Sequence, residues 1–191
     1  MNKKKVLVIT SSPRKKSNSK AAAQLLVTLI KKTSKHLISD EWTDINKVKI
    51  KHCEGCEECA EILKCRIKDA AAGLIKRIDE SDIVIVASPV YFMGTPSRLK
   101  AFIDRNLVKW NGLNSKYGKN VYKIKKGVII LTAEVAGRDN FIGAENEIRS
   151  MFAVNKVKTA AVIKFSRMQM QGSFADNAKA QAAIKKTASL L

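Results

Sequence analysis

The sequence predicts an α/β protein, a doubly wound three-layer sandwich in which helices cover both faces of a five-stranded parallel sheet. Four short runs are almost entirely apolar and lack the alternation of a half-exposed strand, which is typical of parallel strands buried on both faces. Helical patterns separate these runs, so strands and helices alternate along the chain. The apolar runs are residues 6–9, 83–86, 128–131 and 160–163.

The remaining elements follow from weaker patterns. Residues 48–50 place a lysine between two apolar side chains, and this alternation predicts a short strand at one edge of the sheet. Right-handed crossovers between five parallel strands favour the spatial order 2-1-3-4-5. Helices are expected where apolar residues recur at helical spacing, in residues 20–33, 70–78, 97–107, 145–152 and 175–190.

Length and composition predict one domain. The chain has 191 residues and 46% hydrophobic content, enough for one substantial core, so we expect residues 1–191 to form a single domain. No apolar stretch approaches the length of a membrane span, and we expect a cytoplasmic protein. The polar segment 109–126 is the one long connection, which favours a flap or a subunit contact.

The chain is strongly basic, with a net charge of +19 from 36 basic and 17 acidic residues. Such a field attracts nucleic acid, acidic membranes and phosphorylated small molecules alike. Proteins that read bases gather arginines with interleaved aromatic residues, whereas the basic residues here are spread along the whole chain. We therefore interpret most of the charge as solvated surface and do not expect nucleic acid as a partner.

The loop after the first predicted strand is rich in groups that bind anions. Residues 10–19 carry hydroxyls, one amide and three cations, and they open directly into a helix. A helix N-terminus with such side chains suits a phosphate, and the absence of a glycine-rich fingerprint favours a mononucleotide over a pyrophosphate. The alternative is an ordinary N-cap turn with solvated cations, because serine and asparagine cap many helices.

The loop after the third predicted strand, residues 83–86, differs in character. Val90, Tyr91, Phe92 and Met93 follow one another there, which is unusual for a water-exposed turn and offers a flat surface to a planar ring. The alternative is a loop buried in the core. The residues after the next strand, beginning at Thr132, are expected to form the remaining wall of a shared site, since ligands bind at the carboxyl ends of the strands where the strand order reverses.

All four cysteines of the chain lie close together, at Cys53, Cys56, Cys59 and Cys65. Successive C-x-x-C steps present several thiolates from one direction, which suits the corners of an iron–sulfur cluster. A tetrahedral zinc site commonly uses two C-x-x-C pairs separated by a longer spacer, and this chain has none. In a reducing compartment a structural disulfide is not expected, and inert buried thiols are the alternative.

Taken together, these segments resemble the flavodoxin-like NAD(P)H-dependent FMN reductases, and the cysteine run makes the chain more similar to the iron–sulfur flavoproteins of that superfamily. The resemblance covers nearly the whole chain. Its most specific parts are residues 11–14 with 17–19, the cysteine run, and residues 88–92 leading to 99–105. One departure is Glu134, because a carboxylate close to a flavin opposes the anionic reduced ring.

The resemblance implies a flavodoxin-like fold, an FMN-dependent NAD(P)H oxidoreductase and a homodimer or homotetramer. The implied electron acceptor is a quinone, a flavin, an iron–sulfur centre or another redox partner. No side-chain acid or base is expected to be indispensable, since the flavin carries the organic chemistry. The implied phosphate ligands are Ser11, Arg14, Ser17, Asn18 and Ser19; the implied ring contacts are Pro89, Val90, Tyr91 and Phe92, with Thr132 completing the cofactor site; and the implied 4Fe–4S ligands are the four cysteines.

Two other function classes stay open at this point. The chain could be a non-enzymatic electron carrier whose partner protein performs the substrate chemistry. It could also be a basic, zinc-bound nucleic-acid module, which the charge and the cysteines together suggest. Rapid NAD(P)H oxidation by the isolated protein separates an enzyme from a carrier, and metal content with a salt titration of DNA binding tests the module.

Overall fold

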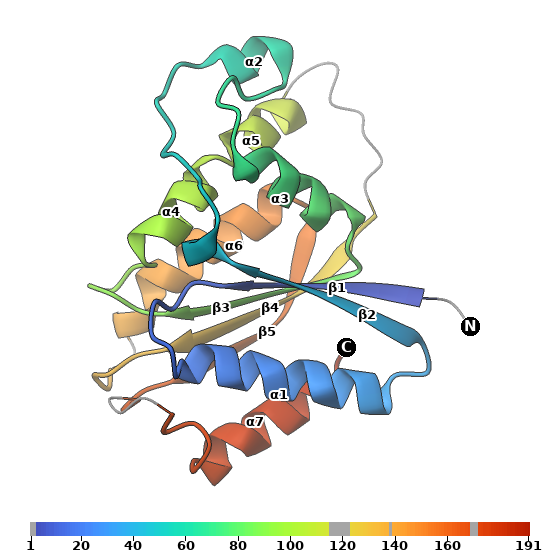
Figure 1. Cartoon of the computed structure of the whole chain (residues 1–191), viewed down its shortest axis with the longest axis vertical. Helices are drawn as coiled ribbons and strands as arrows, with labels where there is room; N and C mark the ends of the chain where they lie inside the picture. The colour runs from blue at the N-terminus through green and yellow to red at the C-terminus, as the bar shows by residue number, and fades with distance from the viewer. Residues whose placement is uncertain (1–2, 115–122, 138, 169–171) are drawn as a thin grey trace.

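Five parallel strands form a single sheet in the computed structural model, in the order β2-β1-β3-β4-β5 (Figure 1). The structure describes residues 3–114, 123–137, 139–168 and 172–191. The predicted strand order and direction are confirmed. The strands are β1 (Lys3–Thr10), β2 (Leu37–Asp44), β3 (Ile83–Pro89), β4 (Lys125–Thr132) and β5 (Val157–Phe165).

Helices cover both faces of this sheet (Figure 1). One face carries α1 (Asn18–Thr33) and α7 (Ala178–Ala188), and the other carries α3 (Ala70–Glu80), α4 (Ser97–Asp104) and α6 (Ile142–Val154). Two shorter helices, α2 (Glu58–Ile62) and α5 (Leu107–Asn114), lie together beyond the second layer, and single 3-10 turns occupy Ile45–Lys47 and Asp139–Phe141. None of the helices in the described ranges has the length and apolar content needed to cross a bilayer.

The central strands are buried on both faces, as their apolar runs predict. Val6 and Val8 pack toward α1 and α7, while Leu7 and Ile9 pack toward α3, α4 and α6. Each fully buried aliphatic side chain contributes about 1.5–3 kcal/mol of transfer free energy. These two apolar layers fix the sheet, and thereby fix where its carboxyl edge presents its loops.

The predicted edge strand at residues 48–50 is wrong. The edge strand is β2, a charged stretch that pairs with β1 alone and keeps only one of its residues, Thr43, buried. An edge strand with this much exposure tolerates polar side chains, so its sequence lacks an apolar signal. Val48 and Ile50 are apolar because they pack against the core from outside the ladder.

The structure differs in detail from two further predictions. The single helix expected over residues 97–107 is divided into α4 and α5, with Asn106 turning its side chain back to donate to the carbonyl of Phe102. The long connection expected over 109–126 begins inside α5 and ends inside β4. Residues 115–122 of that segment lie outside the described residues.

Candidate functional site

A cavity of about 90 Å³ opens at the carboxyl ends of β1, β3 and β4. These strands end side by side, because Thr10 pairs with Ala87 and Pro89 pairs with Thr132. Seven of the ten residues predicted to contact a cofactor line this cavity: Arg14, Ser17, Asn18, Pro89, Val90, Tyr91 and Thr132. Ser12, Ala133, Glu134 and Met168 complete the lining.

Ser17 serves both of the roles that the sequence left open. Its hydroxyl caps α1 by accepting a hydrogen bond of 3.1 Å from the backbone N–H of Lys20, and the same residue lines the cavity. Ser19 lies behind it, buried, with its hydroxyl 3.1 Å from that of Ser17. The positive end of α1 therefore faces the cavity, which favours an anionic group there.

Ser11 does not line the cavity and instead supports its wall. Its side chain is fully buried and donates a 2.8 Å hydrogen bond to the hydroxyl of Ser88, while its backbone N–H donates to the carbonyl of Ala87. The hydroxyl of Ser88 in turn donates to the carbonyl of Pro89. This chain of contacts fixes the loop after β1 to the end of β3.

The Asn18 amide holds the C-terminal part of the chain against the first loop. Its nitrogen donates to the hydroxyl of Ser173 at 3.1 Å, and its oxygen accepts from the backbone N–H of Phe174 at 3.1 Å. Met168 lines the cavity beside it. No sequence pattern indicates the position of Met168, since its contact with Asn18 joins residues 150 positions apart.

Residues 91–94 form a tight turn that projects from the end of β3. Tyr91 and Gly94 exchange backbone hydrogen bonds of 3.0 and 2.9 Å, and both central residues have positive φ, 48° at Phe92 and 65° at Met93. Such turns normally use asparagine and glycine, and bulky residues there store about 1–3 kcal/mol each. Phe92 is fully exposed and lies outside the cavity lining, unlike Tyr91 and Val90.

Helix α6 anchors this strained turn. The backbone N–H of Ala144 donates to the carbonyl of Met93 at 3.0 Å. The Glu147 carboxylate accepts from both the backbone N–H and the hydroxyl of Thr95, at 2.9 and 2.6 Å. Strain at a site persists only where the surroundings hold it, and these contacts supply that hold.

Gly143 makes the close approach of α6 to this turn sterically feasible. A Cβ at this position would collide with the carbonyl oxygen of Met93, so we expect Gly143→Ala to lower the free energy of unfolding by about 1–3 kcal/mol. Gly73→Ala on α3 is the matched control: its Cβ meets nothing within 4 Å, and it is expected to raise stability by up to about 1 kcal/mol. Urea denaturation measures both, and equal effects would contradict the role of Gly143.

The cysteine segment, residues 53–65, contains α2 and lies against α5, and none of its residues lines this cavity. All four thiols are free: Cys59 is buried, Cys53 and Cys65 are half-buried, and Cys56 is exposed. The amide nitrogen of Asn111 on α5 donates to the Cys59 sulfur at 3.2 Å. Within the described residues, no three His, Cys, Asp or Glu side chains converge closely enough to hold a metal ion.

The four cysteines are the right ligands for an iron–sulfur cluster, but within the described residues their sulfurs do not converge on one point. Four free thiols within one segment provide the ligand type and number of a 4Fe–4S cluster. Arg66 donates to Glu54 at 2.8 Å and to Glu58 at 2.9 Å, tying together the residues that flank Cys56. The residues between Glu54 and Arg66 would have to rearrange to bring the four sulfurs around one cluster.

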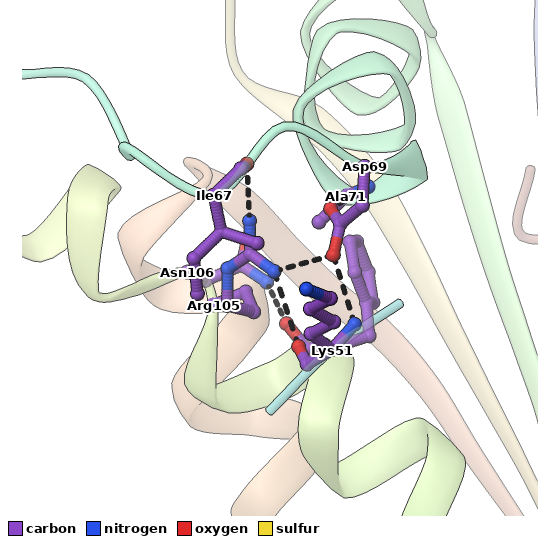
Figure 2. Close-up of polar contacts among 7 residues, drawn as sticks. Lys51, Ile67, Asp69, Ala71, Arg105 and Asn106 are labelled. Carbon is purple, nitrogen blue, oxygen red and sulfur yellow. Dashed lines mark hydrogen bonds and ion pairs between the residues drawn. The ribbon is translucent and has the colours of Figure 1, made fainter. Parts of the chain in front are cut away.

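Arg105 clamps the two ends of the cysteine segment together. Its side chain is almost fully buried, and it donates to the carbonyl of Lys51 at 3.1 Å, to the carbonyl of Ile67 at 3.0 Å and to the carboxylate of Asp69 at 2.7 Å. Figure 2 shows the guanidinium lying between these three partners. The chain before Cys53 and the chain after Cys65 are therefore held at one buried cation.

Asp69 is the second element of this clamp. Burial alone would raise the pKa of Asp69, but hydrogen bonds from Arg105 and from the backbone N–H groups of Lys51 and Ala71 outweigh it and hold that pKa below its ordinary value. A carboxylate with a depressed pKa stabilises the fold above its unfolded pKa and loses that contribution as the pH falls through the folded value. The clamp is therefore intact at neutral pH and weakens only in acid, below a pH of about 4.

Two curated proteins resemble this chain in sequence. An iron-sulfur flavoprotein from Archaeoglobus fulgidus is 31% identical over 133 residues, which cover 69% of this chain and 57% of that protein. An FMN-dependent NADH:quinone oxidoreductase from Gluconobacter oxydans is 27% identical over 64% of each chain. The chain thus spans little more than half the length of the first of these relatives and just under two thirds of the second.

Solved structures share the fold at low sequence identity. An FMN-dependent NADH-azoreductase from Bacillus anthracis, solved with FMN, superposes with a TM-score of 0.69 at 11% identity, covering 97% of this chain and 98% of that one. An NAD(P)H:quinone oxidoreductase from Methanothermobacter marburgensis gives a TM-score of 0.67 at 16% identity, with coverage of 96% and 94%. The NADPH-dependent FMN reductase family matches residues 4–169, and the chain belongs to this family.

Proposed function

We propose that this chain is an FMN-dependent oxidoreductase that takes electrons from NADPH or NADH. The observation that carries the proposal is the cavity where β1, β3 and β4 end, because hydroxyl, amide and arginine side chains meet the start of α1 there. The chemistry that FMN supplies when bound is hydride acceptance from a nicotinamide and delivery of the electrons to an acceptor. The family assignment supports this use of the cavity.

In this proposal the residues of the chain bind and orient, and no side chain transfers a proton. Arg14 and Ser17, with the N-terminal amides of α1, would hold the phosphate. Val90 and Tyr91 would place the flavin ring at the end of β3, with Thr132 of the neighbouring strand β4 beside them. Two of the similar proteins are named as quinone oxidoreductases, and we extend a quinone-type acceptor to this chain.

The test is NADPH and NADH oxidation by the purified protein, with and without added FMN and with a soluble quinone as acceptor. We expect rapid oxidation that requires FMN. Tight FMN binding with little nicotinamide oxidation would instead favour the electron-carrier function, in which a partner protein reduces the flavin. Failure to bind FMN at all would overturn both.

We infer that the four cysteines bind a 4Fe–4S cluster, whose chemistry when bound is the storage of one electron at a time. Their free thiols and the clamp at Arg105 support this inference, as do the relatives named iron-sulfur flavoproteins. The cations Arg66 and Arg105 lie close to the segment and would offset thiolate charge. The cluster would require the segment to fold around it.

Anaerobic reconstitution with iron and sulfide is expected to load about four iron atoms per chain. Single Cys→Ser variants at Cys53, Cys56, Cys59 and Cys65 should each lower the iron content and the broad visible absorption. One zinc per chain with steeply salt-dependent DNA binding would contradict this and support the nucleic-acid module.

We further infer that a second copy of the chain completes the flavin site. The cavity volume of about 90 Å³ is far below the roughly 300 Å³ at the lower end for ligand pockets. Phe92 and Met93 are exposed on the turn beside it, and Trp110 is 54% exposed on α5. Light scattering should give a homodimer or homotetramer, and a monomer with full FMN affinity would contradict it.

A further inference from the structure

A second cavity, of about 240 Å³, lies between α3, α5 and the end of the cysteine segment. It shares no lining residue with the cavity at the carboxyl edge of the sheet. Its wall is mainly aliphatic, with Ile75 from α3 and Val108 and Leu113 from α5. A cavity of this size and character suits a molecule of one or two rings, since larger ligands occupy about 300–1,000 Å³.

The polar groups of this cavity point to a ligand that carries an oxygen acceptor. Arg105 lines it and is only 2% exposed, and its Nε makes no hydrogen bond within the described part of the chain. Cys65 also lines the cavity and interacts with Arg105, but sulfur is a weak acceptor. A buried donor without a good acceptor destabilises the fold, and a ligand oxygen would relieve that cost.

The charges around the cavity favour an anion. Lys64, Arg105 and Lys109 line it, and no carboxylate does so among the described residues. Arg105 and Lys109 already have carboxylate partners, at Asp69 and Asp79, which reduces their pull without reversing its sign. An aromatic ring with an ionised oxygen therefore matches both the aliphatic wall and the positive potential.

We propose that this cavity is a binding site for a small hydroxyquinone, with its ring between α3 and α5 and an oxygen on Arg105. The choice of a quinone rests on the proposed function, and the inference goes beyond it by assigning a site separate from the flavin cavity. The chain itself contributes an aliphatic wall from α3 and α5 and one buried hydrogen-bond donor, the Nε of Arg105.

Two glycines provide a matched pair of variants. Gly112 on α5 lines the cavity, whereas Gly73 on α3 does not, and a Cβ at either position meets nothing within 4 Å. Gly112→Leu should therefore fill the cavity, while Gly73→Leu makes the same chemical change on a helix facing open space. Ala72→Leu, also in the lining, is a second blocking variant in case Gly112→Leu does not fold.

The test is calorimetric titration of the protein as purified with 2-hydroxy-1,4-naphthoquinone, with and without excess FMN. We expect one site per chain whose Kd is unaffected by FMN, is raised at least about tenfold by Gly112→Leu or Ala72→Leu, and is unchanged by Gly73→Leu. The neutral 2-methoxy analogue should bind more weakly. Binding abolished by FMN, binding equal in all variants, or no binding would overturn the inference.

This outcome is separable from that of the proposed function. If the flavin-loaded protein oxidises NADPH with ferricyanide as acceptor but shows no Gly112-dependent binding, only this inference fails. If it oxidises no nicotinamide with any acceptor, the proposed function fails, whatever the titration shows.

Discussion

Replacing Arg105 with methionine is expected to lower the free energy of unfolding by about 3–5 kcal/mol, the usual effect of removing one partner of a buried ion pair. The side chains of Arg105 and Asp69 are 1% and 7% exposed, so the variant leaves a carboxylate buried without its counter-ion. It also frees the carbonyls of Lys51 and Ile67 (Figure 2). Urea denaturation measures the loss.

Lys100→Met is the control for that variant. Lys100 also forms an ion pair, with Asp104 on the same helix, but both side chains are more than 40% exposed. Such pairs contribute about 0.3–0.5 kcal/mol, so the free energy of unfolding of the control should change little.

The Arg105 variant should also be cut faster by protease within residues 53–65. A loss below about 1 kcal/mol would contradict the clamp.

Replacing Arg14 with glutamine is expected to weaken FMN binding by about 10- to 100-fold, since hydrogen bonds to charged groups contribute about 1.5–3 kcal/mol. Arg14 lines the cavity in the loop that precedes α1. Quenching of flavin fluorescence gives the Kd.

Lys15→Gln is the matched control for Arg14. The two residues are adjacent and exposed, and the substitutions remove the same charge, but Lys15 does not line the cavity. A contact with the phosphate requires a much larger effect at Arg14. Equal effects at both positions would show that only the long-range field of the basic surface acts, and would contradict the assignment of Arg14.

The sequence predicts the fold well where burial on both faces leaves a run of apolar residues, as in β1, β3 and β4. It fails at β2, whose single neighbouring strand lets Asp40 and Glu41 sit in the ladder. The order of the strands could still be predicted, because the handedness of the crossovers does not depend on where the edge strand begins.

The candidate site could be predicted in part. Hydroxyls and cations before a helix indicate an anion site from local chemistry alone, and Arg14 and Ser17 do line the cavity. Contacts between distant segments leave no such signal. The Ser11 side chain bonds to Ser88, and the Asn18 amide, which also lines the cavity, bonds to Ser173 and Phe174. Arg105 belongs to the run 99–105 that carries part of the family resemblance. Its role as a clamp depends on three partners that only the fold brings together.

Parallel titrations of FMN and riboflavin into the purified protein test the phosphate cradle most directly, because the two ligands differ only in the phosphate. We expect one FMN per chain, riboflavin binding weaker by at least about 100-fold, and a much smaller difference in the Arg14→Gln variant. Equal affinity for the two flavins, or no binding of either, would contradict it.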